Sequence, residues 1–309
     1  MTALEAVATY LPDERVPIED LAGQLGLTAM QIKVFRRFHG FAEVRRDRDG
    51  SLLDLLDGAL RALDALRGRE HLVRYVLYAR SFAVGAPYPE NPLHDVCRRH
   101  GLRHASAFTV AHQACASGLL AIDMAGRLLA AEPDPDALAL VLAGEKTFTR
   151  ETRLAPDTSV FGEGAAAALV RRDGARDRML AYAASLHGEF DSAEPEVAVR
   201  FQQQYPALLA EAIRTAVNRA GLDMDGISLI LPHNVNAIAW RHTCKQLGIP
   251  RSRVLLDNVP VTGHVFCADA FVNYQTAVRR GLLRPGDRYV VSAAGAARGA
   301  TLSAMVFEH

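Results

Sequence analysis

His112-Gln113-Ala114-Cys115-Ala116-Ser117-Gly118 stands between two apolar runs of different periodicity. The residues before it, 106–111, have the β-branched and aromatic character of a buried strand, and residues 118–130 have the character of a helix. Cys115 therefore falls at a strand-to-helix junction, where unpaired backbone N–H groups and the helix dipole favour thiolate over thiol. We expect a nucleophilic cysteine here, and the alternative is an ordinary buried cysteine.

Strands and helices alternate on both sides of this junction. The expected strands cover residues 3–10, 71–79, 105–111, 137–143, 165–170, 179–186, 227–231, 254–256, 288–294 and 301–307. The expected helices begin near Pro17 and Ser51 and cover residues 92–100, 118–130, 206–220, 237–247 and 268–280. This order predicts an α/β protein. The charged stretch 171–177 is the expected boundary between two halves, 1–173 and 174–309, with similar orders of elements.

The composition argues against several classes of protein. The chain of 309 residues carries 35 basic and 35 acidic side chains, so its net charge gives no attraction for nucleic acid or an anionic membrane. The N-terminus has no basic region followed by an apolar core, and we expect no membrane span. The four cysteines are widely spaced, which favours a reducing compartment over a disulfide framework or a zinc site. We expect a cytoplasmic protein without a metal.

Two histidines follow predicted strands in the C-terminal half. His233 comes just after strand 227–231, and His264 follows Gly263 after strand 254–256. Ligands gather at the carboxyl ends of strands in open α/β sheets, so we expect both histidines to share one site with Cys115. Each histidine alone is more typical of a structural hydrogen bond. Together the three residues indicate covalent catalysis, in which a thiolate takes an acyl group from a thioester and imidazoles stabilise negative charge on a carbonyl oxygen.

Motifs along nearly the whole chain point to one family. They include Thr9-Tyr10-Leu11-Pro12, Gln113-Ala114-Cys115-Ala116-Ser117-Gly118, Gly144-Glu145-Lys146, Phe161-Gly162-Glu163-Gly164-Ala165, Pro232-His233-Asn234-Val235-Asn236, 282–286 and 303–306. In these stretches the chain resembles thiolase-fold condensing enzymes of the type III, or initiating, β-ketoacyl-ACP synthase branch. The resemblance implies a five-layered αβαβα fold of two pseudo-twofold-related βαβαβ halves, in a homodimer. Cys115 would lie in the N-terminal half, and His233 and His264 in the C-terminal half.

The chain departs from that family's pattern at several positions. The family usually has Asn where this chain has His264, which gives a Cys-His-His set like that of elongating synthases. An imidazole can hold a thioester carbonyl as Asn does, and it can also act as a base. Glu163 replaces the usual Asp, and Val34 stands where an adenine-clamping Trp is expected. The glycine-rich loop that helps to form the oxyanion hole reads differently over residues 293–299, so its second donor stays unassigned.

The resemblance also implies how substrates bind. Asn236, Gly295 and Phe161 are the expected substrate-binding residues. No bound cofactor is expected, because the acyl group arrives on the phosphopantetheine of an acyl carrier protein or of CoA. The missing clamp favours a carrier protein, and the candidate residues for docking it are Arg36, Arg37 and Arg251. The alternative for each arginine is a solvated charged surface.

Three functions fit these residues. We expect a Cys115 acyl-enzyme that condenses with a malonyl-type thioester, with loss of carbon dioxide, in biosynthesis of a fatty-acid- or polyketide-like product. The alternative is a non-decarboxylating acyltransferase that makes an ester or amide, with an imidazole as the base. A different class is a non-catalytic partner subunit of a condensing enzyme. Asp269 is expected to be a first-turn helix carboxylate, and the alternative is a catalytic group. Cys267 is expected to be a packing residue.

Overall fold

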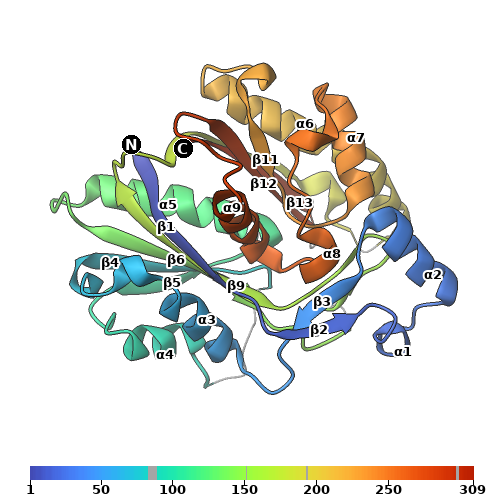
Figure 1. Cartoon of the computed structure of the whole chain (residues 1–309), viewed down its shortest axis with the longest axis horizontal. Coiled ribbons are helices and arrows are strands. Elements are labelled where there is room, and N and C mark those ends of the chain that lie inside the picture. The colour runs from blue at the N-terminus through green and yellow to red at the C-terminus, as the bar shows by residue number, and fades with distance from the viewer. Residues whose placement is uncertain (83–88, 151, 193, 297–298) are drawn as a thin grey trace.

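A sheet of nine strands runs through the computed structural model, which describes residues 1–82, 89–150, 152–192, 194–296 and 299–309 (Figure 1). The strand order is β11-β12-β13-β10-β1-β9-β6-β4-β5. The strands are β1 (Thr2–Tyr10), β4 (Val73–Ala79), β5 (Ser106–Val110), β6 (Leu138–Glu145), β9 (Gly164–Arg172), β10 (Arg178–His187), β11 (Leu229–Leu231), β12 (Arg288–Ala296) and β13 (Ala300–Glu308). A single residue pair, Ala3 with Arg178, joins β1 to β10. Two extensively paired parts of the sheet therefore meet at this seam.

Helices cover both faces of each part. They are α3 (Leu52–Arg61), α4 (Pro92–Arg99), α5 (Ser117–Ala131), α6 (Pro195–Arg219), α7 (Ala237–Leu247) and α9 (Asp269–Arg279), with the short α1 (Ala22–Leu25), α2 (Ala29–Val34) and α8 (Val259–Thr262). Neighbouring residues of β6 face opposite sides, since Leu140 clusters with α3 and α4 and Val141 with α5 and α9. In β13, Met305 clusters with α5 and α9, and Val306 with α6 and α7. The layers α3/α4, sheet, α5/α9, sheet and α6/α7 confirm the predicted five-layered α/β fold.

The middle layer belongs to both halves of the chain. Its hydrophobic cluster includes Leu119 of α5, Phe271 of α9 and strand residues from both parts of the sheet. The two halves therefore share a core. The division at residue 173 stays a prediction, and it falls in the turn between β9 and β10.

Helix α5 packs against strands from both parts of the sheet. With the turn before it, Ala114–Ala131 is an 18-residue segment of mean hydropathy 1.4, long and apolar enough to cross a membrane by length and composition. Its apolar run is not uninterrupted, since it contains Asp123 and Arg127. The segment is 61% buried inside the protein, as a core helix between two sheets is.

The segment that follows β1 differs from the sequence prediction. Residues 17–21 were expected to start a helix, but the strand β2 (Glu14–Pro17) pairs there with β3 (Glu43–Arg46). The pairing buries Val16 and Val44 in one cluster with α1 and α2. Residues 18–21 form a turn, and the helix α1 begins only at Ala22, after the predicted start.

Two further predictions were wrong in the C-terminal half. Residues 254–256 form no strand, and Val254 makes only an isolated bridge to Ile230. Helix α6 begins at Pro195, eleven residues before the predicted start, and Pro206 lies inside it. Proline is typical of a first helical turn, which is why the sequence indicated a start there. The remaining expected strands and helices are confirmed, including the Ser51 cap of α3.

Candidate active site

Cys115 lies in a tight turn that leads from β5 into α5. The 3₁₀ turn Ala114–Ala116 directly precedes α5, and the backbones of His112 and Ala114 have positive φ angles of 70° and 45°. Such angles are strained for residues with a Cβ and are typical of functional turns. Gly295 of β12 packs against this turn, because a Cβ there would lie 1.9 Å from the Gln113 carbonyl oxygen. The turn thus holds the half-buried thiol at the junction of the two halves.

His264 faces the thiol from the loop after α8. Its Nε2 atom lies 3.2 Å from Cys115 Sγ, within hydrogen-bonding distance. Its Nδ1 atom is hydrogen-bonded to the carboxylate of Asp269. The ring of Phe161 packs on the imidazole with a centroid distance of 4.8 Å. One imidazole therefore connects a buried carboxylate with the candidate nucleophile.

Asp269 belongs to the site, although the sequence favoured only a helix-start carboxylate over a catalytic group there. It is the first residue of α9, as predicted, but its carboxylate also accepts hydrogen bonds from the backbone N–H groups of Asn234 (2.6 Å) and Val265 (2.7 Å). It thereby fixes the loops that carry both candidate histidines. The signal in the sequence is its position five residues after His264, at a helix start that can turn the side chain back onto the loop.

The carboxylate determines the charge of His264. Burial acts to lower the pKa of His264, but the Asp269 carboxylate and the Cys115 sulfur outweigh it and raise the pKa to about 10. The imidazole is therefore protonated at neutral pH. A cation at this position stabilises a thiolate on Cys115.

Ser81 adds a second hydrogen bond to the thiol, and the sequence did not indicate it. Its hydroxyl donates to Cys115 Sγ at 3.2 Å and lies 3.7 Å from the buried Cys267 Sγ. The Glu145 carboxylate accepts from the backbone N–H groups of Ser81 (2.8 Å) and Phe82 (3.0 Å). Glu145 thus positions the end of β4 at the thiol. Burial raises the pKa of Glu145.

His233 lies beside His264 but turns its Nε2 atom elsewhere. The two imidazole centroids are 6.0 Å apart. Nε2 of His233 is hydrogen-bonded to the Tyr205 hydroxyl at 2.8 Å, and the His233 carbonyl accepts from Trp240 Nε1 at 3.2 Å. Burial, with a smaller effect of His264, lowers the pKa of His233 to about 3. His233 is therefore neutral at neutral pH.

Phe161 and Asn236 were expected to bind substrate, and they lie beside His264 and at the start of α7. Phe161 stacks on Phe266 at a centroid distance of 4.6 Å, beside His264. Asn236 caps α7, since its Oδ1 atom accepts from the Ala239 N–H at 2.7 Å and its Nδ2 atom donates to the Thr158 carbonyl at 3.1 Å. In this chain Asn236 orders the loop after β11. Residues 297 and 298 of the predicted oxyanion loop lie outside the described residues.

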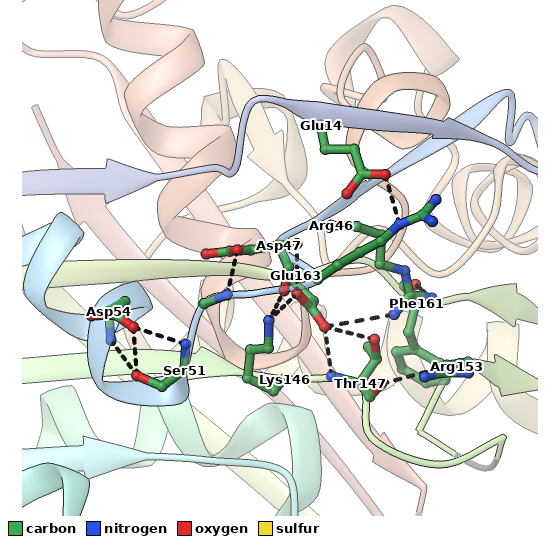
Figure 2. Close-up of polar contacts among 12 residues, drawn as sticks. Glu14, Arg46, Asp47, Ser51, Asp54, Lys146, Thr147, Arg153, Phe161 and Glu163 are labelled. Carbon is green, nitrogen blue, oxygen red and sulfur yellow. Dashed lines mark hydrogen bonds and ion pairs between the residues drawn. The ribbon is translucent and has the colours of Figure 1, made fainter.

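Glu163 anchors the segment that carries Phe161 (Figure 2). Its buried carboxylate accepts hydrogen bonds from Lys146 Nζ (2.7 Å), from the N–H (3.0 Å) and hydroxyl (2.8 Å) of Thr147, and from the Asp47 N–H (2.9 Å). Arg46 lies 3.7 Å from the carboxylate and donates to the Phe161 carbonyl. Burial acts to raise the pKa of Glu163, but these partners, Lys146 foremost, lower it. The charged cluster thus holds the segment of Phe161, whose ring packs on His264.

The candidate docking arginines are exposed on segments that contact α7. Arg36 forms an exposed ion pair with Glu19 at 2.6 Å, and Arg37 lies over the half-exposed ring of Phe38. Arg251 is exposed and starts a 3₁₀ turn after α7. Helix α7 packs against both the segment Phe35–His39 and this turn. The three arginines therefore lie on segments that flank one helix.

Comparisons with known proteins agree with this architecture. The family profile described as 3-oxoacyl-[acyl-carrier-protein (ACP)] synthase III C terminal matches residues 217–309. A β-ketoacyl-[acyl-carrier-protein] synthase III of Rhizorhabdus wittichii is 27% identical over 215 residues, which cover 63% of this chain and 65% of that protein. One of Nitratidesulfovibrio vulgaris is 25% identical over 219 residues, with the same coverage. The matches thus span just under two thirds of these relatives.

Solved structures match nearly the whole chain. The acyltransferase ChlB3 has a TM-score of 0.85 at 22% identity, covering 99% of this chain and 97% of that one. The 3-oxoacyl-[acyl-carrier-protein] synthase III of Aquifex aeolicus has a TM-score of 0.85 at 20% identity, with both chains fully covered. These likenesses confirm the predicted thiolase-like fold.

Proposed function

We propose that this chain, which belongs to the type III ketosynthase-like family, is an acyltransferase that carries its acyl group on Cys115 and passes it to a hydroxyl or amine. One observation carries the proposal: His264 joins the buried Asp269 carboxylate to the Cys115 thiol through its two ring nitrogens. A carboxylate on Nδ1 makes Nε2 a stronger base, which is the arrangement that deprotonates an alcohol or amine. An Asn at position 264 offers no such base.

The first half-reaction loads the cysteine. The Cys115 thiolate attacks the carbonyl carbon of an acyl thioester, and the bond from that carbon to the donor sulfur breaks. The departing donor thiolate takes the proton held on Nε2 of His264. The products are the Cys115 thioester, a free donor thiol and a neutral His264.

The second half-reaction uses that neutral imidazole. Nε2 of His264 takes the proton from the acceptor's hydroxyl or amine as the acceptor attacks the Cys115 thioester. The carbon–sulfur bond breaks and Cys115 leaves as thiolate, next to an imidazole that is protonated again. An ester or amide is released, and both groups are back in their starting charge states. Throughout this cycle Asp269 acts as the positioning residue that holds Nδ1.

Decarboxylative condensation is the second candidate. The names of the curated relatives, β-ketoacyl-[acyl-carrier-protein] synthases III, favour it. In that reaction two donors would hold the carbonyl of a malonyl-type thioester while its carboxylate leaves as carbon dioxide. His264 can supply one donor, but Nε2 of His233 is hydrogen-bonded to Tyr205. The geometry therefore favours transfer over condensation.

The acyl donor is proposed to arrive on an acyl carrier protein or on CoA. Arg37 and Arg251 are exposed next to α7, where they can meet an acidic carrier or the phosphate of its phosphopantetheine. We propose a homodimer in the cytoplasm, with Phe161 and Gly295 at the acyl site. The hydrogen bonds of Ser81 and His264 to Cys115 favour an enzyme over a non-catalytic partner subunit.

The experiment that tests the proposal starts from enzyme preloaded with an acyl group. Loaded enzyme is offered a panel of alcohols and amines and, separately, a malonyl-carrier thioester. An ester or amide formed without carbon dioxide supports transfer. A β-ketoacyl product with release of carbon dioxide, and no ester or amide, would replace transfer by condensation.

A further inference from the structure

Tyr205 occupies the ring nitrogen of His233 that a condensing site would use. Its hydroxyl lies 2.8 Å from Nε2 of His233, and the tyrosine is 8% exposed. Trp240 also packs edge-on against this imidazole, at a centroid distance of 6.3 Å, and donates its Nε1 hydrogen to the His233 carbonyl. The imidazole is thereby held in one orientation.

The two histidines consequently differ in what they offer a substrate. His264 is cationic and points Nε2 at Cys115, whereas His233 is neutral and points Nε2 at a phenol. A neutral imidazole has one ring proton, so a single hydrogen bond at Nε2 determines whether that atom can bind a carbonyl oxygen. Tyr205 makes that bond in this chain.

The position of Tyr205 is fixed by its own helix and by aromatic neighbours. It precedes Pro206 within α6, and proline lacks the N–H that would bond the carbonyl four residues earlier, so the helix can bend at this point. Phe201 lies one turn before Tyr205, with a centroid distance of 5.7 Å, and Phe190 packs on Phe201 at 5.1 Å. This aromatic row holds the phenol over His233.

Tyr205 also keeps its proton. Burial, and after it the charge of Cys115, raises the pKa of the Tyr205 hydroxyl above its usual value. The phenol therefore stays a neutral hydrogen-bonding group at every pH at which the enzyme would work. It also belongs to the electrostatic surroundings of Cys115.

We propose that Tyr205 is a specificity-determining residue: by binding Nε2 of His233 it removes the second carbonyl donor that condensation requires and so directs the Cys115 acyl group to a hydroxyl or amine. This inference rests on the proposed function. In condensation, the bond between the malonyl methylene and its carboxylate breaks, carbon dioxide leaves, and the electron pair forms an enolate with negative charge on the thioester oxygen. The enolate carbon then attacks the Cys115 thioester and expels the thiolate. Without a second donor, the enolate oxygen is poorly stabilised.

The test is Tyr205→Phe, which keeps the aromatic ring and removes the hydroxyl. One donor to a developing oxyanion is worth about 100-fold in rate or more, so we expect carbon dioxide release from a malonyl-carrier thioester to rise at least about tenfold relative to ester or amide formation. Adding His233→Ala to this variant should abolish the gain, because the gain depends on the freed Nε2. Tyr289→Phe is the matched control. This control loses a buried hydroxyl that is hydrogen-bonded to Asp177 at 2.9 Å. Tyr289 lies about 20 Å along β12 from Gly295, so its loss should leave the ratio of carbon dioxide release to ester or amide formation unchanged.

The outcomes separate this inference from the proposed function. If wild type and Tyr205→Phe both take up the acyl group and transfer it with the same product ratio, Tyr205 does not set specificity, and the transferase proposal stands. If the gain persists without His233, the inference is also overturned. Wild-type enzyme that takes up no acyl group would remove the proposed function and this inference with it. Comparing the thermal unfolding of Tyr205→Phe and Tyr289→Phe shows whether a change in product ratio comes from a less stable fold.

Discussion

The carboxylate of Asp269 accepts a hydrogen bond from Nδ1 of His264, and both side chains are almost completely excluded from solvent, at 1% and 3% exposed. A buried carboxylate beside a buried imidazole stabilises the imidazolium form. The charge of the imidazole beside Cys115 is thus determined by a residue that does not touch the sulfur.

Asp269→Asn should slow the reaction of Cys115 with iodoacetamide at neutral pH by about tenfold or more. The variant removes the charge that raises the pKa of His264, so the imidazolium loses stability and the thiolate next to it is less populated. The measurement is the pH profile of alkylation, followed by mass spectrometry at Cys115. Asp64→Asn, which alters an exposed ion pair, is the control and should leave the profile unchanged. An Asp269→Asn profile identical to that of wild type would show that the carboxylate does not control the thiol.

His233 should make the fold less stable in acid. The pKa of His233 is about 3 in the folded protein and about 6.5 in the unfolded chain, so between these pH values only the unfolded state binds the proton. The stability from this group is complete above about pH 6.5 and is lost as the pH falls, with a slope approaching about 1.4 kcal/mol per pH unit. Urea unfolding from pH 7 to 4 measures the slope. It should be smaller in His233→Gln, and equal slopes in both proteins would contradict a neutral buried His233.

Glu163→Ala should destabilise the protein by about 3–5 kcal/mol, because it leaves the buried cations Lys146 and Arg46 without their anion. Glu163→Gln should cost less, since the amide still fills the space and accepts hydrogen bonds. Denaturant unfolding gives both values. Asp64→Ala breaks an ion pair whose side chains are more than 70% exposed and should cost less than about 1 kcal/mol. Similar costs for Glu163→Ala and Asp64→Ala would show that the cluster in Figure 2 does not stabilise the fold.

Arg37→Glu and Arg251→Glu should raise the KM for an acyl carrier protein donor by about tenfold each at low salt. Charge reversal opposes association with an acidic carrier, and added salt should diminish the effect. A short acyl-pantetheine donor, which lacks the carrier's surface, should be used equally well by the variants and the wild type. Arg67→Glu changes an exposed arginine near α3 and serves as the control. Equal KM values for all four proteins would leave these arginines as solvated surface charges.

The strands and the main helices could be predicted from the sequence because burial on two faces leaves a continuous apolar pattern. β6 is buried at every position, and the central helix α5 is buried on most of its surface. The secondary structure was predicted wrongly where contacts between distant segments determine it. Val16 lies in β2, which pairs with the strand of Val44 although α1 and α2 separate the two strands in the sequence. Pro206 indicated a helix start although it lies inside α6.

The candidate site could be predicted only in part. The motifs identified Cys115 and His264, and the fold brings their side chains into contact. Ser81 and Tyr205 were not identified, and Asp269 was not favoured as a site residue, because each acts through a hydrogen bond that depends on how separate loops and helices meet. Tyr205 in particular fell outside the predicted bounds of its helix. The sequence favoured condensation, whereas these contacts favour acyl transfer.

Intact-protein mass spectrometry shows directly whether Cys115 carries the acyl group. After incubation with an acyl-carrier or acyl-CoA thioester, wild type and Cys267→Ala should each gain the mass of one acyl group, mapped to Cys115, and Cys115→Ala should gain none. An unmodified wild-type mass with every donor, or an adduct that persists in Cys115→Ala, would contradict the account.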